Sequence, residues 1–174
     1  MANEFVSTLC ARTSCRAYSP ELPSKEELDQ VVEAGLWAAS GRNCQSPIFL
    51  VVTNKDLRDR LSKLNAAVMS APIDPFYGAP AVIVVLARRE DPTHVYDGSL
   101  AMGNMMAAAN ALGLASCWIH RAREVFDTDE GKAILADLGV EGDYEGIGNL
   151  IVGRYAGEKA APKPRVEGRV FYAE

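Results

Sequence analysis

The sequence has few of the residues that build metal centres or disulfide frameworks. Its four cysteines are scattered at positions 10, 15, 44 and 117 without a Cys-x-x-Cys pair, and it has only two histidines, His94 and His120. This spacing does not supply the ligand set of a metal centre. Scattered, unpaired cysteines are typical of a reducing compartment, so we expect a cytoplasmic protein without a bound metal.

The sequence also lacks the common glycine-rich phosphate-binding motifs. It has no Gly-x-x-x-x-Gly-Lys-Ser/Thr loop, and Gly146 and Gly148 supply only part of a Gly-x-Gly-x-x-Gly pattern. The residues after them read as a strand, whereas that pattern requires a helix. A phosphate bound to this protein must therefore be held by side chains.

The sequence has fewer basic than acidic residues, and its net charge is −5 over 174 residues. An acidic chain is a poor general binder of nucleic acids or anionic membranes. The first ten residues include Glu4 and no basic run, unlike a secretory signal. The apolar window 100–119 contains Asn104 and Asn110, which favour a buried helix and strand over a membrane span. We expect no nucleic-acid partner and no membrane insertion.

Helical and strand-like patterns alternate along the chain. We expect helices over 3–11, 24–39, 54–64, 99–112 and 129–138, and strands over 48–53, 81–87, 114–119 and 147–155. Ser24 and Glu27 have the spacing of a capping box. We expect Leu36 and Trp37 to face the core, and the strand 48–53 to be buried on both faces. Such interleaving in a chain of one-domain length predicts an α+β or α/β sandwich.

Two segments have no regular pattern. Residues 66–79 contain Pro72, Pro75 and Gly78, and a loop of this length often lines or covers a site. Residues 156–174 are basic and proline-containing and end in the strand-like "RVFY". This tail is too polar to fold alone, so it is either disordered or docks elsewhere, such as on a partner subunit. We therefore expect a domain over 1–155 and an extension over 156–174.

Alternating polar residues in "ARTSCR" point to an anion. Arg12, Ser14 and Arg16 share one side of an extended segment, and guanidinium groups with a hydroxyl suit phosphate oxygens. Lys163 and Arg165 alternate in the same way in the tail. A solvated basic patch would explain either group taken alone.

Three further features concern a ligand. Ser40, Asn43 and Gln45 cluster before a strand, and their side chains have the donors and acceptors that a heterocycle edge requires, although a plain turn explains them too. His120 follows the strand 114–119, where a lone histidine is more often structural than catalytic. No Ser-His-Asp order or carboxylate pair is evident, so the chemistry of an enzyme here would belong to a cofactor.

In chain order, several stretches together resemble the FMN-dependent nitroreductase family. They are "ARTSCRAYS", "VVEAGLWAASGRNCQSPIFLVV", "YGAPAVIVVLA", "NMMAAANALGLASCWI", "IGNLIVGRY" and "KPR". The resemblance implies an α+β protein: a three-layer α/β/α sandwich whose mixed, mainly antiparallel sheet is flanked by helices. It also implies a homodimer with two FMN sites at its interface and a C-terminal tail docked on the partner.

The resemblance also implies the FMN-binding residues. They are Arg12, Thr13, Ser14, Arg16, Ser40, Gly41, Asn43, Gln45, His120, Arg121, Lys163 and Arg165. The residues that the resemblance assigns to the phosphate are Arg12, Ser14, Lys163 and Arg165. Arg16 would lie near the pyrimidine end of the flavin. The loop 40–45 comes from the second subunit, and residues 120–121 present backbone N–H groups to the flavin.

The implied activity is an NAD(P)H-dependent flavin oxidoreductase. Hydride passes from NADH or NADPH through FMN to a nitroaromatic, quinone or related small acceptor by a ping-pong mechanism. Alternatives are a specialised flavin reductase (dehalogenation or enoate reduction) and an FMN-storage protein without turnover. A thiol-redox protein is a third, since arginines beside Cys15 and Cys44 would lower a thiol pKa.

The sequence departs from the family pattern at three places. Ala39 replaces a common proline, and Gln45-Ser46-Pro47 replaces a frequent Gln-Pro-Trp. His120 and Arg121 stand where a small residue is usual, which predicts unusually basic surroundings for the flavin.

Overall fold

The computed structural model describes residues 3–174, so the first two residues of the expected domain lie outside the described residues. In chain order the elements are α1 (Glu4–Ala11), α2 (Lys25–Leu36), η1 (Gly41–Asn43), β1 (Pro47–Val52), α3 (Lys55–Val68), β2 (Ala81–Arg88), α4 (His94–Ala111), β3 (Ala115–Ile119), α5 (Ala122–Phe126), α6 (Asp129–Asp137) and β4 (Tyr144–Gly153). The expected helices and strands are all present, while η1 and α5 were not anticipated. Helix α4 also begins earlier, at His94 instead of residue 99.

The four strands form one sheet in the order β1-β2-β4-β3, and every pairing is antiparallel. The sheet is thus antiparallel throughout and not mixed. Strand β2 lies inside the sheet and is almost wholly buried, whereas β1 lies at its edge. The prediction that 48–53 is buried on both faces is therefore wrong, since an edge strand has one neighbour and Val51 is 45% exposed.

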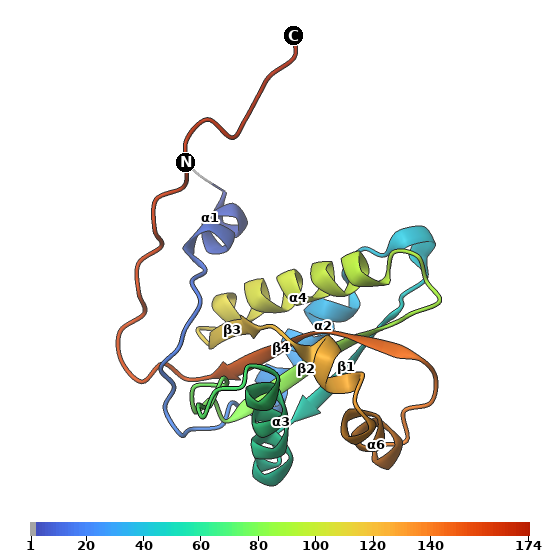
Figure 1. Ribbon diagram of the computed structural model, residues 1–174. Helices are drawn as coiled ribbons and strands as arrows, with labels where there is room; N and C mark the ends of the chain where they lie inside the picture. Colours follow the sequence, from blue (N-terminus) through green and yellow to red (C-terminus); the bar gives the residue numbers. More distant parts are fainter. Residues whose placement is uncertain (1–2) are drawn as a thin grey trace.

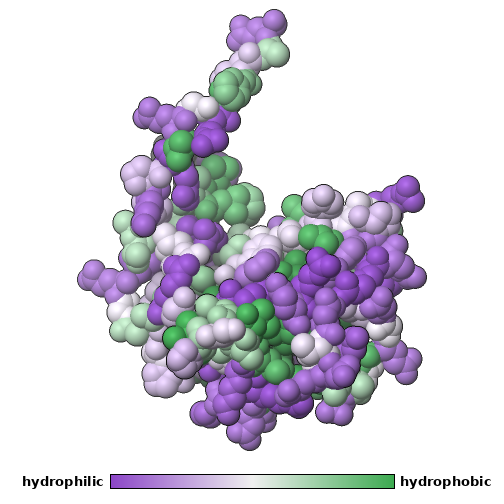
Figure 2. Space-filling view, in the orientation of Figure 1, coloured by the Kyte–Doolittle hydropathy of each residue, from purple (hydrophilic) through white to green (hydrophobic). Residues whose placement is uncertain are grey.

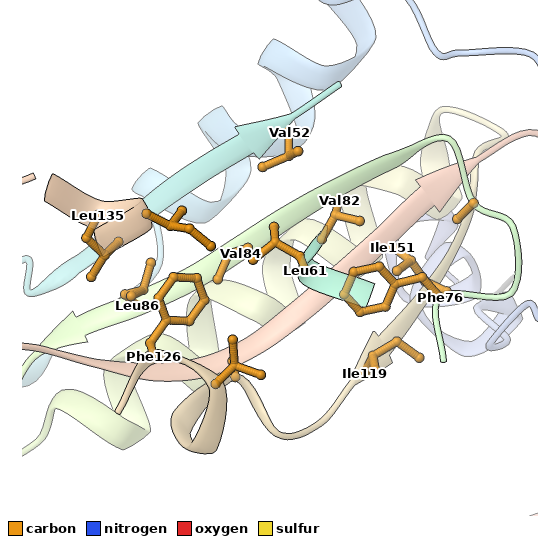
Figure 3. Close-up of a cluster of buried hydrophobic side chains, with 14 of the residues drawn as sticks. Val52, Leu61, Phe76, Val82, Val84, Leu86, Ile119, Phe126, Leu135 and Ile151 are labelled. Carbon is orange, nitrogen blue, oxygen red and sulfur yellow. The ribbon is translucent and has the colours of Figure 1, made fainter. Parts of the chain in front are cut away.

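Helices cover both faces of the sheet (Figure 1). On one face Leu61 of α3, Phe126 of α5 and Leu135 of α6 join the alternate strand residues Val82 and Val84 (Figure 3). The opposite face packs against α2 and α4 through the residues Leu28, Val31, Met102 and Met105. The period-2 alternation of the strands supplies one core to each face. The expected three-layer α/β/α sandwich is confirmed.

Helix α2 begins as expected and ends earlier than expected. The Ser24 hydroxyl accepts the Glu27 N–H, and the Glu27 carboxylate accepts the Ser24 N–H, which completes the capping box. The helix ends at Leu36, and Leu36 and Trp37 are 59% and 81% exposed. Their expected inward placement is wrong within the protomer, because Leu28 and Val31 define the buried side of this helix.

The C-terminal tail leaves the sandwich after β4. Tyr18 and Tyr155 form an isolated antiparallel bridge, and residues 156–174 have no strand or helix. The expected strand character of "RVFY" is therefore absent, and Val170, Phe171 and Tyr172 are exposed. Residues 156–160 still contact the body, and the rest of the tail stands clear of it near α1 (Figures 1 and 2). Among the helices of residues 3–174, none has the length and apolarity needed to cross a membrane.

Candidate functional site

The segment 12–18 is held in an extended conformation beside the sheet. The Cys15 N–H donates to the Ser116 carbonyl near the start of β3 at 2.9 Å, and the Ser19 N–H donates to the Arg154 carbonyl at 3.0 Å. Ser14 and Arg16 are exposed, and Arg12 is partly buried. That the three side chains share one side stays a prediction.

This segment and the start of the tail enclose a pocket of about 430 Å³. Residues 13–17 form one wall and residues 155–160 the other. The Thr13 hydroxyl donates to the Ala160 carbonyl at 3.3 Å, which ties the two walls together. The two ends of the chain therefore meet here, as a phosphate shared between them requires. Lys163 and Arg165 lie farther along the exposed tail.

Arg12 has an unsatisfied hydrogen-bond donor. Its Nη1 is buried and, within residues 3–174, has no hydrogen-bond partner. A buried donor without a partner costs free energy, so such a group usually marks a ligand. Arg12 directly precedes the pocket residue Thr13, so its free donor fits an anionic group such as the phosphate of FMN.

The arginines of the protein divide into two sets. Six lie within 4.0 Å of a carboxylate oxygen: Arg58, Arg60, Arg88, Arg89, Arg123 and Arg154. In the part of the chain that the structure describes, Arg12, Arg16, Arg42, Arg121, Arg165 and Arg169 have no such partner. All of the second set except Arg169 lie in the segments expected to bind the flavin. These cations are free of internal ion pairs and available to an external anion.

Arg16 makes a contact that sequence reasoning missed. Its guanidinium lies over the ring of Tyr77, 5.9 Å from the centroid. Tyr77 has a left-handed backbone (φ 52°), and Asp74 holds this turn by accepting from the N–H groups of Phe76 and Gly78. The long loop before β2 thus contacts Arg16, while the lining of a site by residues 66–79 stays a prediction. The tyrosine before a glycine was the available signal, but nothing in the sequence pairs it with Arg16.

The loop 40–45 is built around the buried carboxylate of Asp97. Its Oδ1 accepts the Gly41 N–H at 2.9 Å, and its Oδ2 accepts the hydroxyls of Ser46 and Thr93 at 3.1 and 3.0 Å. Arg42, Asn43 and Gln45 all have positive φ, which costs energy for residues with a Cβ. Sequence reasoning missed Asp97, although an acid in the first turn of an apolar helix was a signal.

Two further hydrogen bonds hold the same loop. The Ser40 hydroxyl accepts the Gln45 N–H at 3.0 Å, and the Gln45 amide donates to the Asn43 side-chain oxygen at 3.2 Å. The side chains of Asn43 and Gln45 are exposed. The loop therefore presents a preformed polar surface outward.

The two groups of expected FMN residues lie at opposite ends of α4. Asp97 anchors the loop near the start of the helix, while the Asn110 amide donates to the Thr8 carbonyl of α1 near its end. A rise of 1.5 Å per residue separates Asp97 from Asn110 by about 20 Å. One protomer therefore does not bring Ser40 and Gly41 beside Arg12.

His120 and Arg121 form the turn between β3 and α5. Asn65 of α3 is fully buried; its amide donates to the His120 carbonyl at 2.8 Å, and its oxygen accepts the Arg121 Nε–H at 3.0 Å. Arg121 has φ 74° and is half-buried, whereas His120 is exposed. Asn65 was not anticipated from the sequence.

The cysteines give the thiol-redox alternative little support. Partial burial and the neighbouring Asp91 carboxylate raise the pKa of the Cys44 thiol and outweigh Arg42. Arg42 does act to lower this pKa, as expected, but the net shift is upward, so the expected low pKa of the Cys44 thiol is wrong. The Cys15 thiol donates to the Ala17 carbonyl at 3.1 Å.

The fold and the site together define a class: an α/β/α sandwich with a pocket between the two ends of the chain and arginines that lack an internal acid partner. The nitroreductase family model matches residues 9–75 and 71–154, and the chain belongs to this family. The family resemblance found in the sequence is thereby confirmed.

Two relatives extend this finding. The chain is 31% identical over 140 residues, 78% of its length and 75% of the relative's, to an Archaeoglobus fulgidus protein named as an NADH dehydrogenase/NAD(P)H nitroreductase. It is 25% identical to the FMN reductase [NAD(P)H] of Bacillus subtilis, over 94% of this chain and 70% of that protein.

Solved structures of nitroreductases share the fold of this chain. A nitroreductase with bound FMN from Bacteroides fragilis superposes with a TM-score of 0.91 at 28% identity, covering 99% of this chain and all of the other. A nitroreductase with bound FMN from Desulfitobacterium hafniense gives 0.89 at 26% identity, with both chains fully covered.

Proposed function

We propose that the protein is a homodimeric FMN oxidoreductase that uses NADH or NADPH to reduce a nitroaromatic, quinone or related small acceptor by a ping-pong mechanism. The enzyme class, an NAD(P)H-dependent flavin oxidoreductase, and FMN as its cofactor are those of the family and its named relatives. FMN supplies the redox chemistry when bound, by accepting hydride from the donor and releasing it to the acceptor.

The partnerless Nη1 of Arg12 is the observation that carries this proposal. Arg12, Thr13 and Ser14 line or adjoin the pocket between the two chain ends, and a dianionic phosphate there would satisfy the buried donor. Lys163 and Arg165 would join them once the tail is folded down. Arg16, held over Tyr77, would place a positive charge beside the flavin ring.

A second subunit would complete the site. The loop with Ser40, Gly41, Asn43 and Gln45 is preformed and outward-facing, yet it lies far from Arg12 in its own protomer. A twofold arrangement would bring the loop of one copy to the pocket of the other. Exposed apolar side chains on α1 and in the tail, among them Phe5, Phe171 and Tyr172, would then be covered.

We also propose that the extension 156–174 contributes to the dimer interface and to the phosphate site. It has no fold of its own in the protomer, and its exposed apolar residues favour docking on the partner. Its basic residues would then act at the phosphate.

An absorbance spectrum of purified protein between 300 and 550 nm tests the proposal. We expect a yellow protein whose flavin band bleaches anaerobically on addition of NADH or NADPH and returns with menadione or nitrofurazone. A colourless protein that ignores added FMN would overturn the proposal. A bound flavin that neither nicotinamide reduces would favour the storage alternative instead.

A further inference from the structure

We propose that Arg121 binds an anionic group on the ligand that exchanges hydride with the flavin, and so selects for anionic ligands. This inference rests on the proposed function and on the family resemblance, which implies that residues 120–121 lie at the flavin. The ligand class is a small molecule with a carboxylate or phosphate: either the acceptor or the nicotinamide donor.

Asn65 fixes the arginine in place. The oxygen of this fully buried amide accepts the Arg121 Nε–H at 3.0 Å, and its N–H donates to the His120 carbonyl at 2.8 Å. One buried side chain thus holds both the left-handed turn and the base of the guanidinium. A positioned guanidinium loses less conformational entropy when it binds a ligand than a mobile one.

The two terminal nitrogens of Arg121 are left for another partner. No carboxylate of residues 3–174 lies within 4.0 Å of this guanidinium, and only its Nε is bonded. Arg123, two residues on, behaves differently and pairs with Asp127 and Glu145. The acids of this region therefore neutralise Arg123 and not Arg121, whose fork matches a planar carboxylate or a phosphate.

The phosphate of FMN is not the anion that Arg121 serves. The segment with Arg12 contacts β3 at Ser116, whereas Arg121 follows the far end of that strand. Four residues of strand, from Ser116 to His120, span about 13 Å. The proposed phosphate end and Arg121 are thus separated by the length of β3, which leaves the fork of Arg121 for a different anion.

Arg121→Gln is the matched test in the FMN-loaded enzyme. The glutamine amide nitrogen occupies the same place along the side chain as the arginine Nε, so it can still donate to Asn65 while the fork is removed. The acceptor arm compares kcat/KM for 4-nitrobenzoate with that for the neutral 4-nitrobenzamide. The donor arm measures the dependence of anaerobic flavin bleaching on NADH concentration.

One arm is expected to respond. Loss of a charge-assisted pair lowers the kcat/KM ratio of nitrobenzoate to nitrobenzamide about tenfold to a hundredfold, mainly through KM, if the acceptor carries the anion. If the donor carries it, the NADH concentration for half-maximal bleaching rises by a similar factor and the ratio stays constant. Arg121→Lys keeps the charge without the fork, so its kcat/KM ratio or half-maximal NADH concentration is expected to lie between those of Arg121→Gln and the wild type. It replaces Arg121→Gln in the test if the glutamine variant does not fold.

Arg60→Gln is the control for net charge, since Arg60 lies on α3 in a surface pair with Glu130. The inference is overturned if both arms stay unchanged in Arg121→Gln, if Arg60→Gln gives the same response, or if Arg121→Gln weakens FMN binding tenfold. Wild-type protein that binds no FMN, or is not reduced by either nicotinamide, overturns the proposed function itself and this inference with it. If the wild type turns over normally and Arg121→Gln changes neither arm, the inference is overturned and the proposed function stands.

Discussion

Asp97 accepts the backbone N–H of Gly41 at 2.9 Å across 56 positions of sequence, from the first turn of α4 to the loop before β1. The carboxylate is 2% exposed and also binds the hydroxyls of Ser46 and Thr93. It compensates for the three left-handed residues of that loop.

Replacing this acid should loosen the loop. We expect Asp97→Ala to lower the free energy of unfolding by about 2–4 kcal/mol, since three donors lose their acceptor in a buried site. Urea denaturation measures the change. Asp97→Asn keeps an oxygen for the Gly41 N–H and should cost less; equal losses in the two variants, or a loss below about 0.5 kcal/mol, would contradict this account.

Arg12→Ala should separate ligand binding from stability. We expect the FMN dissociation constant to rise about tenfold to a hundredfold, because a charge-assisted bond to phosphate is lost. The FMN-free protein should lose little stability, since the Nη1 removed has no partner. Isothermal titration and denaturation give the two values. Arg60→Ala, an exposed ion-pair deletion, is the control and should leave FMN affinity unaltered; a stable Arg12→Ala protein with normal affinity would remove the phosphate from this site.

The tail should carry two separable roles. Lys163→Ala with Arg165→Ala is expected to weaken FMN binding about tenfold or more while the dimer persists. Phe171→Ser with Tyr172→Ser should instead shift the protein toward monomer, because those exposed side chains have no partner in the protomer. Sedimentation velocity and FMN titration distinguish the roles. A monomeric wild type, or double variants that behave alike, would count against the proposed docking.

Acid should weaken the turn that carries Tyr77. Burial by itself raises the pKa of Asp74, but hydrogen bonds from Ser62, Arg58, Gly78 and Phe76 outweigh it and hold this pKa below its ordinary value. A lowered pKa in the folded state adds stability above the unfolded value, near pH 4, and this is lost as pH falls further.

Asp74→Asn tests that dependence. The variant should be less stable than the wild type at pH 7, and the gap should narrow as pH falls below about 4. Thermal unfolding between pH 7 and pH 3 measures it. A gap that stays constant over this range would show that the charge of Asp74 contributes nothing.

Local patterns were enough to predict the four strands and the longer helices, while the three layers were implied by the family resemblance. The capping box of Ser24 and Glu27 involves partners three residues apart, and the apolar run of β2 marks a central strand whatever its neighbours are. The ordered family stretches located the loop 40–45, the arginine segment and the tail. Strand β1 was misjudged because an edge strand and a central strand have similar sequences, and only pairing distinguishes them.

The sequence by itself determined the four strands, the longer helices, the capping box of α2 and the family, because each of these depends on patterns along the chain. Only the tertiary structure decided that Asp97 holds the loop, that Asn65 holds Arg121 and that Tyr77 lies under Arg16. It also decided which arginines lack an internal acid. The physical reason is that hydrogen bonds and charges act over a few ångströms, and packing brings together partners that lie more than fifty residues apart in the chain.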